Sequence, residues 1–123
     1  DKSFLIDDID CALKTSDVVV LTLPLTKETE NLFDENRLHK MKNGAILVNI
    51  ARGKIVDEGA LINALNSNLD GAVLDVFENE PLSNDSPFWE LENVILTPHN
   101  SFIGEKNSDR LFKVIMENLE KVL

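Results

Sequence analysis

Three side chains in this sequence have types and positions that suit acid–base and carboxylate-binding chemistry: Arg52, Glu80 and His99. Arg52 precedes a glycine, and its guanidinium could bind a carboxylate through two parallel hydrogen bonds. His99 follows a proline, a rigid setting, and a histidine suits proton transfer near neutral pH. Glu80 precedes a proline that holds its backbone extended, and its carboxylate could orient a histidine. From position alone, Arg52 could equally cap or bridge neighbouring loops, and Glu80 could be an ordinary solvated side chain.

The elements that must position these side chains begin with four short apolar runs rich in β-branched residues. Their apolarity is continuous rather than alternating, which favours strands buried on both faces, as in a parallel sheet. The predicted strands are Val18–Leu21, Ala45–Val48, Ala72–Leu74 and Val94–Leu96.

Helix signals alternate with these runs. Asp34 and Asp57 stand where they can cap helices, and Glu58 is most simply a second residue of the same cap. The first predicted helix covers residues 8–13, and a short second one follows Asp34, contains Leu38 and Met41 and closes at Gly44. The third follows Asp57 and has Ala60, Leu61, Ala64 and Leu65 on one face. The fourth covers residues 104–122, with Leu111, Phe112, Ile115, Met116 and Leu119 at helical spacing. This alternation predicts an α/β fold with right-handed crossovers and helices on both faces of the sheet.

The predicted strands place the three candidate side chains at equivalent points. Arg52 follows the second strand, Glu80 the third and His99 the fourth, while residues 78–92 lack a helical period and form a long loop. In open α/β sheets, ligands bind beyond the carboxyl ends of the strands. Polar clusters after four successive strands therefore indicate one shared crevice.

Composition limits the partners of the chain. Its 123 residues fit one domain, and its net charge of -10, from 22 acidic and 12 basic side chains, repels phosphate backbones and anionic lipid. Neither nucleic acid nor a membrane is an expected partner, and no segment predicts a membrane span. The single cysteine, Cys11, excludes an internal disulfide and favours a reducing compartment, so a cytoplasmic location is expected.

A few residues have simple structural interpretations. Cys11 is expected to be a small buried or half-buried side chain, and His39, beside Lys40, is expected to lie on the surface. Phe88 and Trp89, in the long loop, are interpreted as a packing anchor rather than as a stack for a cofactor.

Several motifs, in order along nearly the whole chain, resemble the D-isomer-specific 2-hydroxyacid dehydrogenases. Their spacing is that of the family, which makes the resemblance specific. One departure is local, because Asn100, Ser101 and Phe102 follow His99 where the family often has Gly or Ala. The motifs are Ser16-Asp17-Val18-Val19, Leu23-Pro24-Leu25-Thr26 with Glu28-Thr29, Asn49-Ile50-Ala51-Arg52-Gly53, Val56-Asp57-Glu58 with Ala60-Leu61, Leu74-Asp75-Val76-Phe77 with Glu80-Pro81, and Leu96-Thr97-Pro98-His99.

The resemblance implies a role for each candidate residue. Arg52 would bind the carboxylate and carbonyl of a small 2-oxo acid, His99 would be the catalytic acid/base, and Glu80 would pair with it. It also implies a homodimeric enzyme that uses NAD, with NADP left open, and no metal site. The implied cofactor-binding residues are Leu23, Pro24, Thr29, Ile50, Ala51, Arg52, Asp75 and His99.

The glycine-rich turn that binds the pyrophosphate in this family is missing from the sequence. Its five glycines, Gly44, Gly53, Gly59, Gly71 and Gly104, do not form that turn. We therefore expect residues 1–123 to be part of a Rossmann-like NAD-binding domain truncated at its N-terminal side, without the first βαβ unit and the substrate domain. The alternative is a non-enzymatic, NAD(H)-sensing interaction protein on the same fold, similar to the C-terminal binding protein corepressors.

Overall fold

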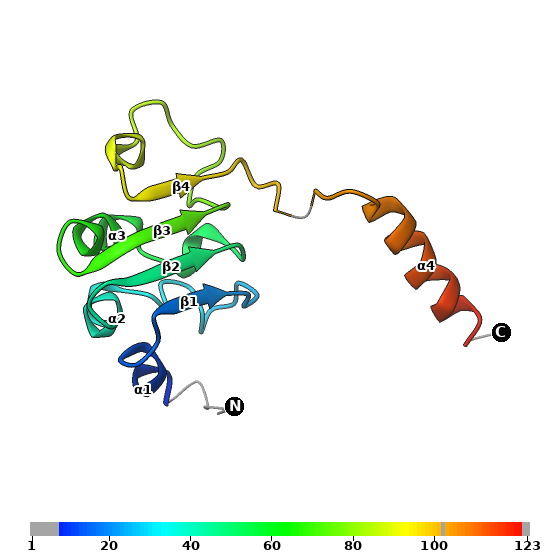
Figure 1. The fold of residues 1–123 in the computed structure, drawn as a ribbon, viewed down its shortest axis with the longest axis horizontal. Helices are drawn as coiled ribbons and strands as arrows, with labels where there is room; N and C mark the ends of the chain where they lie inside the picture. Colours follow the sequence, from blue (N-terminus) through cyan, green and yellow to red (C-terminus); the bar gives the residue numbers. More distant parts are fainter. Residues whose placement is uncertain (1–7, 102, 122–123) are drawn as a thin grey trace.

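A computed structural model of the chain describes residues 8–101 and 103–121. In these ranges four parallel strands form one sheet in the order β1-β2-β3-β4 (Figure 1). The predicted α/β fold is therefore confirmed, with β2 continuing to Asn49 and β3 beginning at Leu69. The strands are β1 (Val18–Leu21), β2 (Ala45–Asn49), β3 (Leu69–Leu74) and β4 (Val94–Leu96).

Helices precede β1, connect the first three strands and follow β4. Two of them begin at the predicted aspartate caps. Asp34 accepts a hydrogen bond from the backbone N–H of Arg37 at 2.9 Å, and Asp57 accepts one from Ala60 at 2.9 Å. Such a cap stabilises a helix by about 1 kcal/mol. The helices are α1 (Ile9–Leu13), α2 (Glu35–Lys40), α3 (Glu58–Leu65) and α4 (Asn107–Leu119).

Two short 3₁₀ helices were not predicted from the sequence. One is η2 (Gly53–Ile55), directly after Arg52. The other is η3 (Pro87–Glu90), which lies inside the segment predicted to be irregular. A single turn is too short to give a helical period, although proline at its first position favours a helical start.

The hydrophobic core lies between one face of the sheet and helices α1, α2 and α3. The strands β1, β2 and β3 and these three helices contribute side chains that are almost fully buried, and η3 adds Phe88, which is 1% exposed. Representative core leucines, one from each of these strands and helices, are Leu13, Leu21, Leu38, Leu47, Leu61 and Leu74.

The other face of the sheet carries no helix in the described part of the chain, which corrects the prediction of helices on both faces. Val20, Val48, Val73 and Ile95 are register partners, so they form one apolar row across the four strands. Val20 is 52% exposed and Ile95 is 62% exposed. The reason is topological, because strands added in one direction through right-handed crossovers place their connecting helices on the same face.

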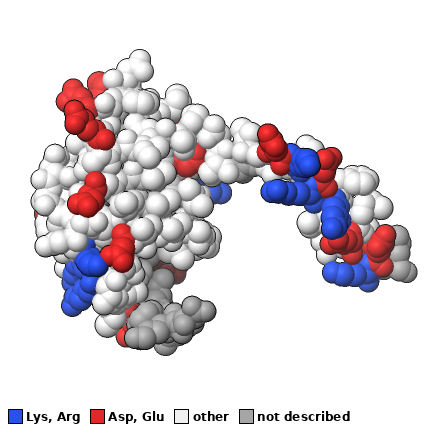
Figure 2. Space-filling view, in the orientation of Figure 1, with Lys and Arg blue, Asp and Glu red and all other residues white. Residues whose placement is uncertain are grey.

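Helix α4 stands away from the sheet (Figure 1). All of its residues are exposed, including the predicted apolar stripe from Leu111 to Leu119. Its polar side mixes both signs of charge (Figure 2), and Lys113 lies 3.7 Å from Glu117 one turn later. Its bounds are shorter than predicted, and residue 122 lies outside the described ranges.

Two expectations about α1 and α2 have different outcomes. His39 is exposed on α2, as expected. Cys11 is exposed instead of buried, because the five-residue helix α1 buries Leu13 toward the core. Within the described ranges, no helix has the length and apolarity needed to cross a membrane.

We expect the uncovered sheet face to cause self-association of this 123-residue chain, because contiguous exposed apolar surface favours association. Replacing Val20 and Ile95 together with lysine should lower the average mass measured by sedimentation equilibrium at high concentration. Replacing Asn36 and Asn63, on the helix-covered side, adds the same charge and should not lower it. Equal masses for the two double variants would contradict this prediction.

Candidate functional site

The parallel sheet brings the three candidate side chains to one edge. Arg52 lies three residues after the end of β2, and Glu80 and His99 follow β3 and β4. Because β2, β3 and β4 run in the same direction and are neighbours, their carboxyl ends meet at that edge. The predicted shared crevice therefore has a structural basis in the strand order.

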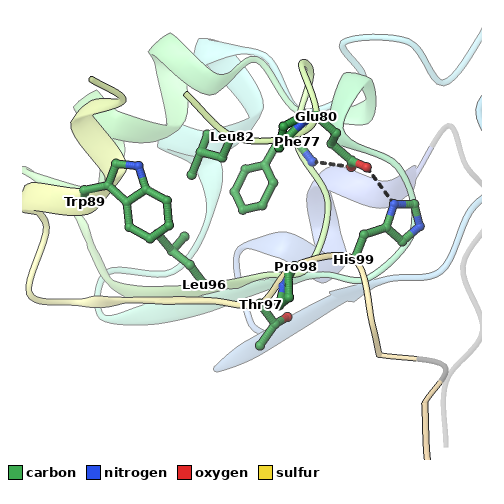
Figure 3. Close-up of a pocket in the computed structure, with 9 residues that line it drawn as sticks. Phe77, Glu80, Leu82, Trp89, Leu96, Thr97, Pro98 and His99 are labelled. Atoms are coloured by element: carbon green, nitrogen blue, oxygen red, sulfur yellow. Dashed lines mark hydrogen bonds and ion pairs between the residues drawn. The ribbon is translucent and has the colours of Figure 1, made fainter. Parts of the chain in front are cut away.

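Glu80 and His99 are in direct contact. The Glu80 Oε2 atom lies 2.8 Å from His99 Nδ1, and Glu80 Oε1 accepts a hydrogen bond from the Phe77 backbone N–H at 3.0 Å (Figure 3). The hydrogen bond with His99, and then that from Phe77, hold the pKa of the Glu80 carboxyl below its usual value. Both side chains are partly exposed, so the pair is open to a ligand.

The backbone of His99 is in the left-handed region, with a φ of 51°. This conformation is uncommon for a residue with a side chain and costs roughly 1–3 kcal/mol unless surrounding contacts hold it. Asp75 supplies such contacts on both sides of His99. Its carboxylate accepts hydrogen bonds from Thr97 Oγ1 at 2.5 Å and from the backbone N–H groups of Asn100 and Ser101 at 2.9 Å each.

Asp75 is buried, with 1% of its surface exposed, and its carboxylate accepts three hydrogen bonds. Burial alone would raise its pKa, but the hydrogen bonds from Thr97, Ser101 and Asn100 outweigh burial and lower the pKa of Asp75 to about 2. The carboxylate is thus ionised at neutral pH and joins the end of β3 to the segment that carries His99.

Arg52 lies beside a cavity at the same edge of the sheet. This cavity, of about 540 Å³, is lined by Arg52 together with Leu23, Pro24, Ile50 and Ala51, which are five of the residues predicted to bind the cofactor. The Asn49 side chain shapes this turn, since its Nδ2 donates to Arg52 O at 3.0 Å and its Oδ1 accepts from Ala51 N at 3.1 Å. Arg52 is an exposed residue, and its guanidinium donates to Ala51 O at 2.6 Å.

Gly53 joins the Arg52 turn to the Glu80 loop. A Cβ atom at this position would overlap the backbone of Phe77 and Glu78. Only a glycine therefore lets the two segments approach this closely. The sequence shows that a glycine follows Arg52, but it gives no sign of which backbone lies against it.

Thr29 lies outside the residues that line the Arg52 cavity. Its hydroxyl donates to Pro24 O at 2.8 Å and accepts from Thr26 N at 2.7 Å. These bonds hold the loop that carries Leu23 and Pro24, so Thr29 acts on the cavity through the loop.

An apolar cavity of about 620 Å³ lies beside the Glu80–His99 pair (Figure 3). Trp89 lines it and is 55% exposed, with its indole N–H donating to Ser83 O at 2.8 Å. The prediction of a packing anchor is therefore correct for Phe88, whose ring lies 6.3 Å from that of Phe77, and wrong for Trp89. In a single 3₁₀ turn, adjacent residues point in different directions, so only one of the two aromatic rings faces the core.

Two residues that shape the site stand in the motifs quoted above but have no predicted role. Thr97, two positions before His99, bonds Asp75, and Asn49, at the end of β2, is 1% exposed. Besides the motifs, their sequence signal is a polar side chain at the end of an apolar strand. Among the described residues, no three His, Cys, Asp or Glu side chains gather in a way that could hold a metal ion.

Comparisons with known proteins agree with the predicted resemblance. The sequence profile described as "D-isomer specific 2-hydroxyacid dehydrogenase, NAD binding domain" matches residues 1–101. A glyoxylate reductase of Korarchaeum cryptofilum is 46% identical over 108 residues, which make up 87% of this chain and 32% of that protein. A glyoxylate/hydroxypyruvate reductase B of Escherichia coli is 52% identical over 93 residues, covering 75% of this chain and 29% of that protein.

A solved structure has the same fold over most of the chain. The crystal structure of a D-isomer specific 2-hydroxyacid dehydrogenase from Xanthobacter autotrophicus, in complex with NADPH and MES, matches with a TM-score of 0.74 and 48% identity. The match covers 76% of this chain and 30% of that one. This chain thus spans about a third of the length of the relatives it matches.

We expect Asp75→Asn to destabilise the fold at neutral pH, because an amide cannot accept all three hydrogen bonds. The pKa of Asp75 is lowered to about 2 on folding, so its contribution is complete above its ordinary pKa and is lost as pH falls toward 2. That contribution is about 2 kcal/mol in the free energy of unfolding. Urea denaturation at pH 6 and pH 2 would measure it.

The stability difference between the chain and its Asp75→Asn variant should shrink between these two pH values. Asp70→Asn, at an exposed position of β3, is the matched control and should change stability little at either pH. A difference that is independent of pH would show that the Asp75 charge is not what stabilises this segment.

Proposed function

Because this chain belongs to the D-isomer specific 2-hydroxyacid dehydrogenase family, over its NAD binding domain, we propose that the protein containing it is an oxidoreductase. It transfers a hydride between NAD(H) and a small 2-oxo or 2-hydroxy acid. The observation that carries this proposal is the contact of 2.8 Å between Glu80 and His99, at the sheet edge that also holds Arg52.

In this proposal the nicotinamide, when bound, supplies the hydride. The chain's own residues then bind the acid and deliver a proton. Arg52 is exposed beside its cavity, and its guanidinium can bind the substrate carboxylate through two hydrogen bonds. Fixing the substrate in this way brings its carbonyl to one orientation, which removes much of the entropic cost of the reaction.

His99 is the proton donor for reduction of the carbonyl. Glu80 holds Nδ1, which leaves Nε2 free to meet the carbonyl oxygen of the acid. The hydrogen bond between Glu80 and Nδ1 also fixes the plane of the ring. In the reverse direction, the same nitrogen takes the proton from the hydroxyl group of a 2-hydroxy acid.

The substrate we propose is a small 2-oxo acid such as glyoxylate or hydroxypyruvate. Support comes from the relatives, which are named glyoxylate reductase and glyoxylate/hydroxypyruvate reductase. The same names favour an enzyme over the nucleotide-sensing alternative.

The cofactor we propose is NAD, with NADP also possible because a related structure holds NADPH. Leu23, Pro24, Ile50 and Ala51 line the cavity that would receive one side of it, and Asp75 bonds the backbone directly after His99. We also propose that the phosphate-binding turn and the substrate domain belong to other parts of a longer protein, since this chain spans about a third of its relatives. We also propose that this longer protein is a cytoplasmic homodimer.

Loss of the His99 imidazole should abolish most of the turnover. In the full-length protein with NADH and a panel of 2-oxo acids, His99→Ala should lower kcat by about 10²- to 10⁴-fold, the usual contribution of a general acid. His39→Ala, at an exposed position of α2, is the control and should leave kcat unchanged. If no acid is reduced, or if His99→Ala is fully active, the proposed function is wrong.

Substitution of Arg52 tests substrate binding separately. A hydrogen bond to a charged group contributes about 1.5–3 kcal/mol, so Arg52→Gln should lower kcat/KM for the oxo acid by about 10- to 100-fold. Arg110→Gln, on the exposed helix α4, removes the same charge far from the sheet edge and should have no effect. Steady-state kinetics of the three proteins would measure this, and an unchanged kcat/KM for Arg52→Gln would remove Arg52 from the site.

A further inference from the structure

Two neighbouring peptide N–H groups in the loop after β3 are each held by a carboxylate. The N–H of Phe77 donates to Glu80 Oε1 at 3.0 Å, as described above. The N–H of Glu78 donates to Glu58 Oε1 at 2.7 Å, although Glu58 lies 20 residues earlier in the chain. Glu58 is the first residue of α3, so this contact ties a core helix to the loop that carries Glu80.

Glu58 is not needed to cap its own helix. Asp57 already accepts the hydrogen bond from Ala60 N that caps α3. The Glu58 side chain instead reaches across to the loop, and the Glu78 side chain returns the contact, with Oε1 at 3.5 Å from the Glu58 backbone N. The interpretation of Glu58 as a simple capping residue is therefore incomplete.

The Glu58 carboxylate lies in an environment that disfavours its negative charge. Burial, together with the nearby Glu78 carboxylate, raises the pKa of Glu58, while the hydrogen bond from the Glu78 N–H opposes that rise. A helix-end carboxylate with no other contact would remain in water, where its charge is well solvated. The half-buried position follows from its bond to the loop.

The same peptide also lies against the Arg52 turn. Gly53 lies against the backbone of Phe77 and Glu78 so closely that no Cβ fits between them. The peptide between Phe77 and Glu78 is therefore contacted both by Gly53 of the Arg52 turn and by the Glu58 side chain. Glu80 reaches His99 from the loop that starts at this peptide (Figure 3).

We propose that Glu58 is a positioning residue: by holding the Glu78 N–H it fixes the loop from which Glu80 reaches and orients His99. Its effect on the reaction rests on the proposed function, whereas its effect on Glu80 does not. It acts through Glu80 and needs no contact with the substrate.

The first test measures the Glu80 carboxyl itself by NMR titration of side-chain carboxyl carbons in this chain. In Glu58→Ala the loop is released, and the pKa of Glu80, now held low by His99 and Phe77, should rise toward its ordinary value. Glu58→Gln keeps an oxygen that accepts the Glu78 N–H, so the pKa of Glu80 should stay low. Glu35→Ala, at the same first position of α2, is the control for a helix-end charge and should also leave it low.

Glu58→Asp keeps the charge but shortens the side chain by one methylene, so it tests reach without a loss of charge. It should raise the pKa of Glu80 as Glu58→Ala does, and it serves in place of the alanine variant if that protein does not fold. A pKa of Glu80 that stays low in both variants would overturn the proposal.

The second test measures turnover in the full-length protein. A misplacement of about 1 Å can cost on the order of 100-fold in rate, so Glu58→Ala should lower kcat by about 10- to 100-fold with little change in KM. Glu58→Gln should restore kcat to within about twofold. Full activity of Glu58→Ala would also overturn the proposal. If the unmodified protein reduces no 2-oxo acid, the proposed function fails, and the titration of Glu80 still decides the role of Glu58.

Discussion

The parallel register of β2, β3 and β4 is the constraint on which the candidate site depends. Asn49 pairs with Leu74, and Leu74 pairs with Leu96, so the three strands end at the same level. Chain segments that leave the sheet at one level can meet without long connections, which limits the entropy lost in bringing Arg52, Glu80 and His99 together. A register shift of one strand by one residue would turn its alternating side chains to the opposite face of the sheet and would separate these groups.

Carboxylates that accept hydrogen bonds from backbone N–H groups fix the loops at this edge of the sheet. Asp75 bonds the residues around His99, and Glu80 and Glu58 bond neighbouring peptides of the loop after β3. A loop has no ladder of its own, and each such bond to a charged group contributes about 1.5–3 kcal/mol. Three anchors of this kind stabilise irregular backbone, including the left-handed His99.

The sequence predicts the parts of this structure that follow from local chemistry. Apolar runs predict the strands, Asp34 and Asp57 predict two helix starts, and the position of Glu80 and His99 after adjacent strands predicts that they meet. It does not predict contacts that depend on how separate loops approach, such as Glu58 with Glu78. Periodicity also does not reveal which face of a sheet the helices cover, because that depends on strand order, and it cannot separate the buried Phe88 from the exposed Trp89.

Among the residues that the structure describes, helices pack on only one face of the sheet, and the contacts that position the site come from that covered face. The anchors that position Glu80 start from α3 and from the turn after β2, both of which pack on the covered side. Phe77 is 8% exposed and packs against Phe88, so the start of the Glu80 loop is part of the core. Interiors packed at this density deform little. The geometry of Glu80 and His99 is therefore set by the core and three carboxylates, while the exposed row from Val20 to Ile95 is free to meet other surfaces without disturbing it.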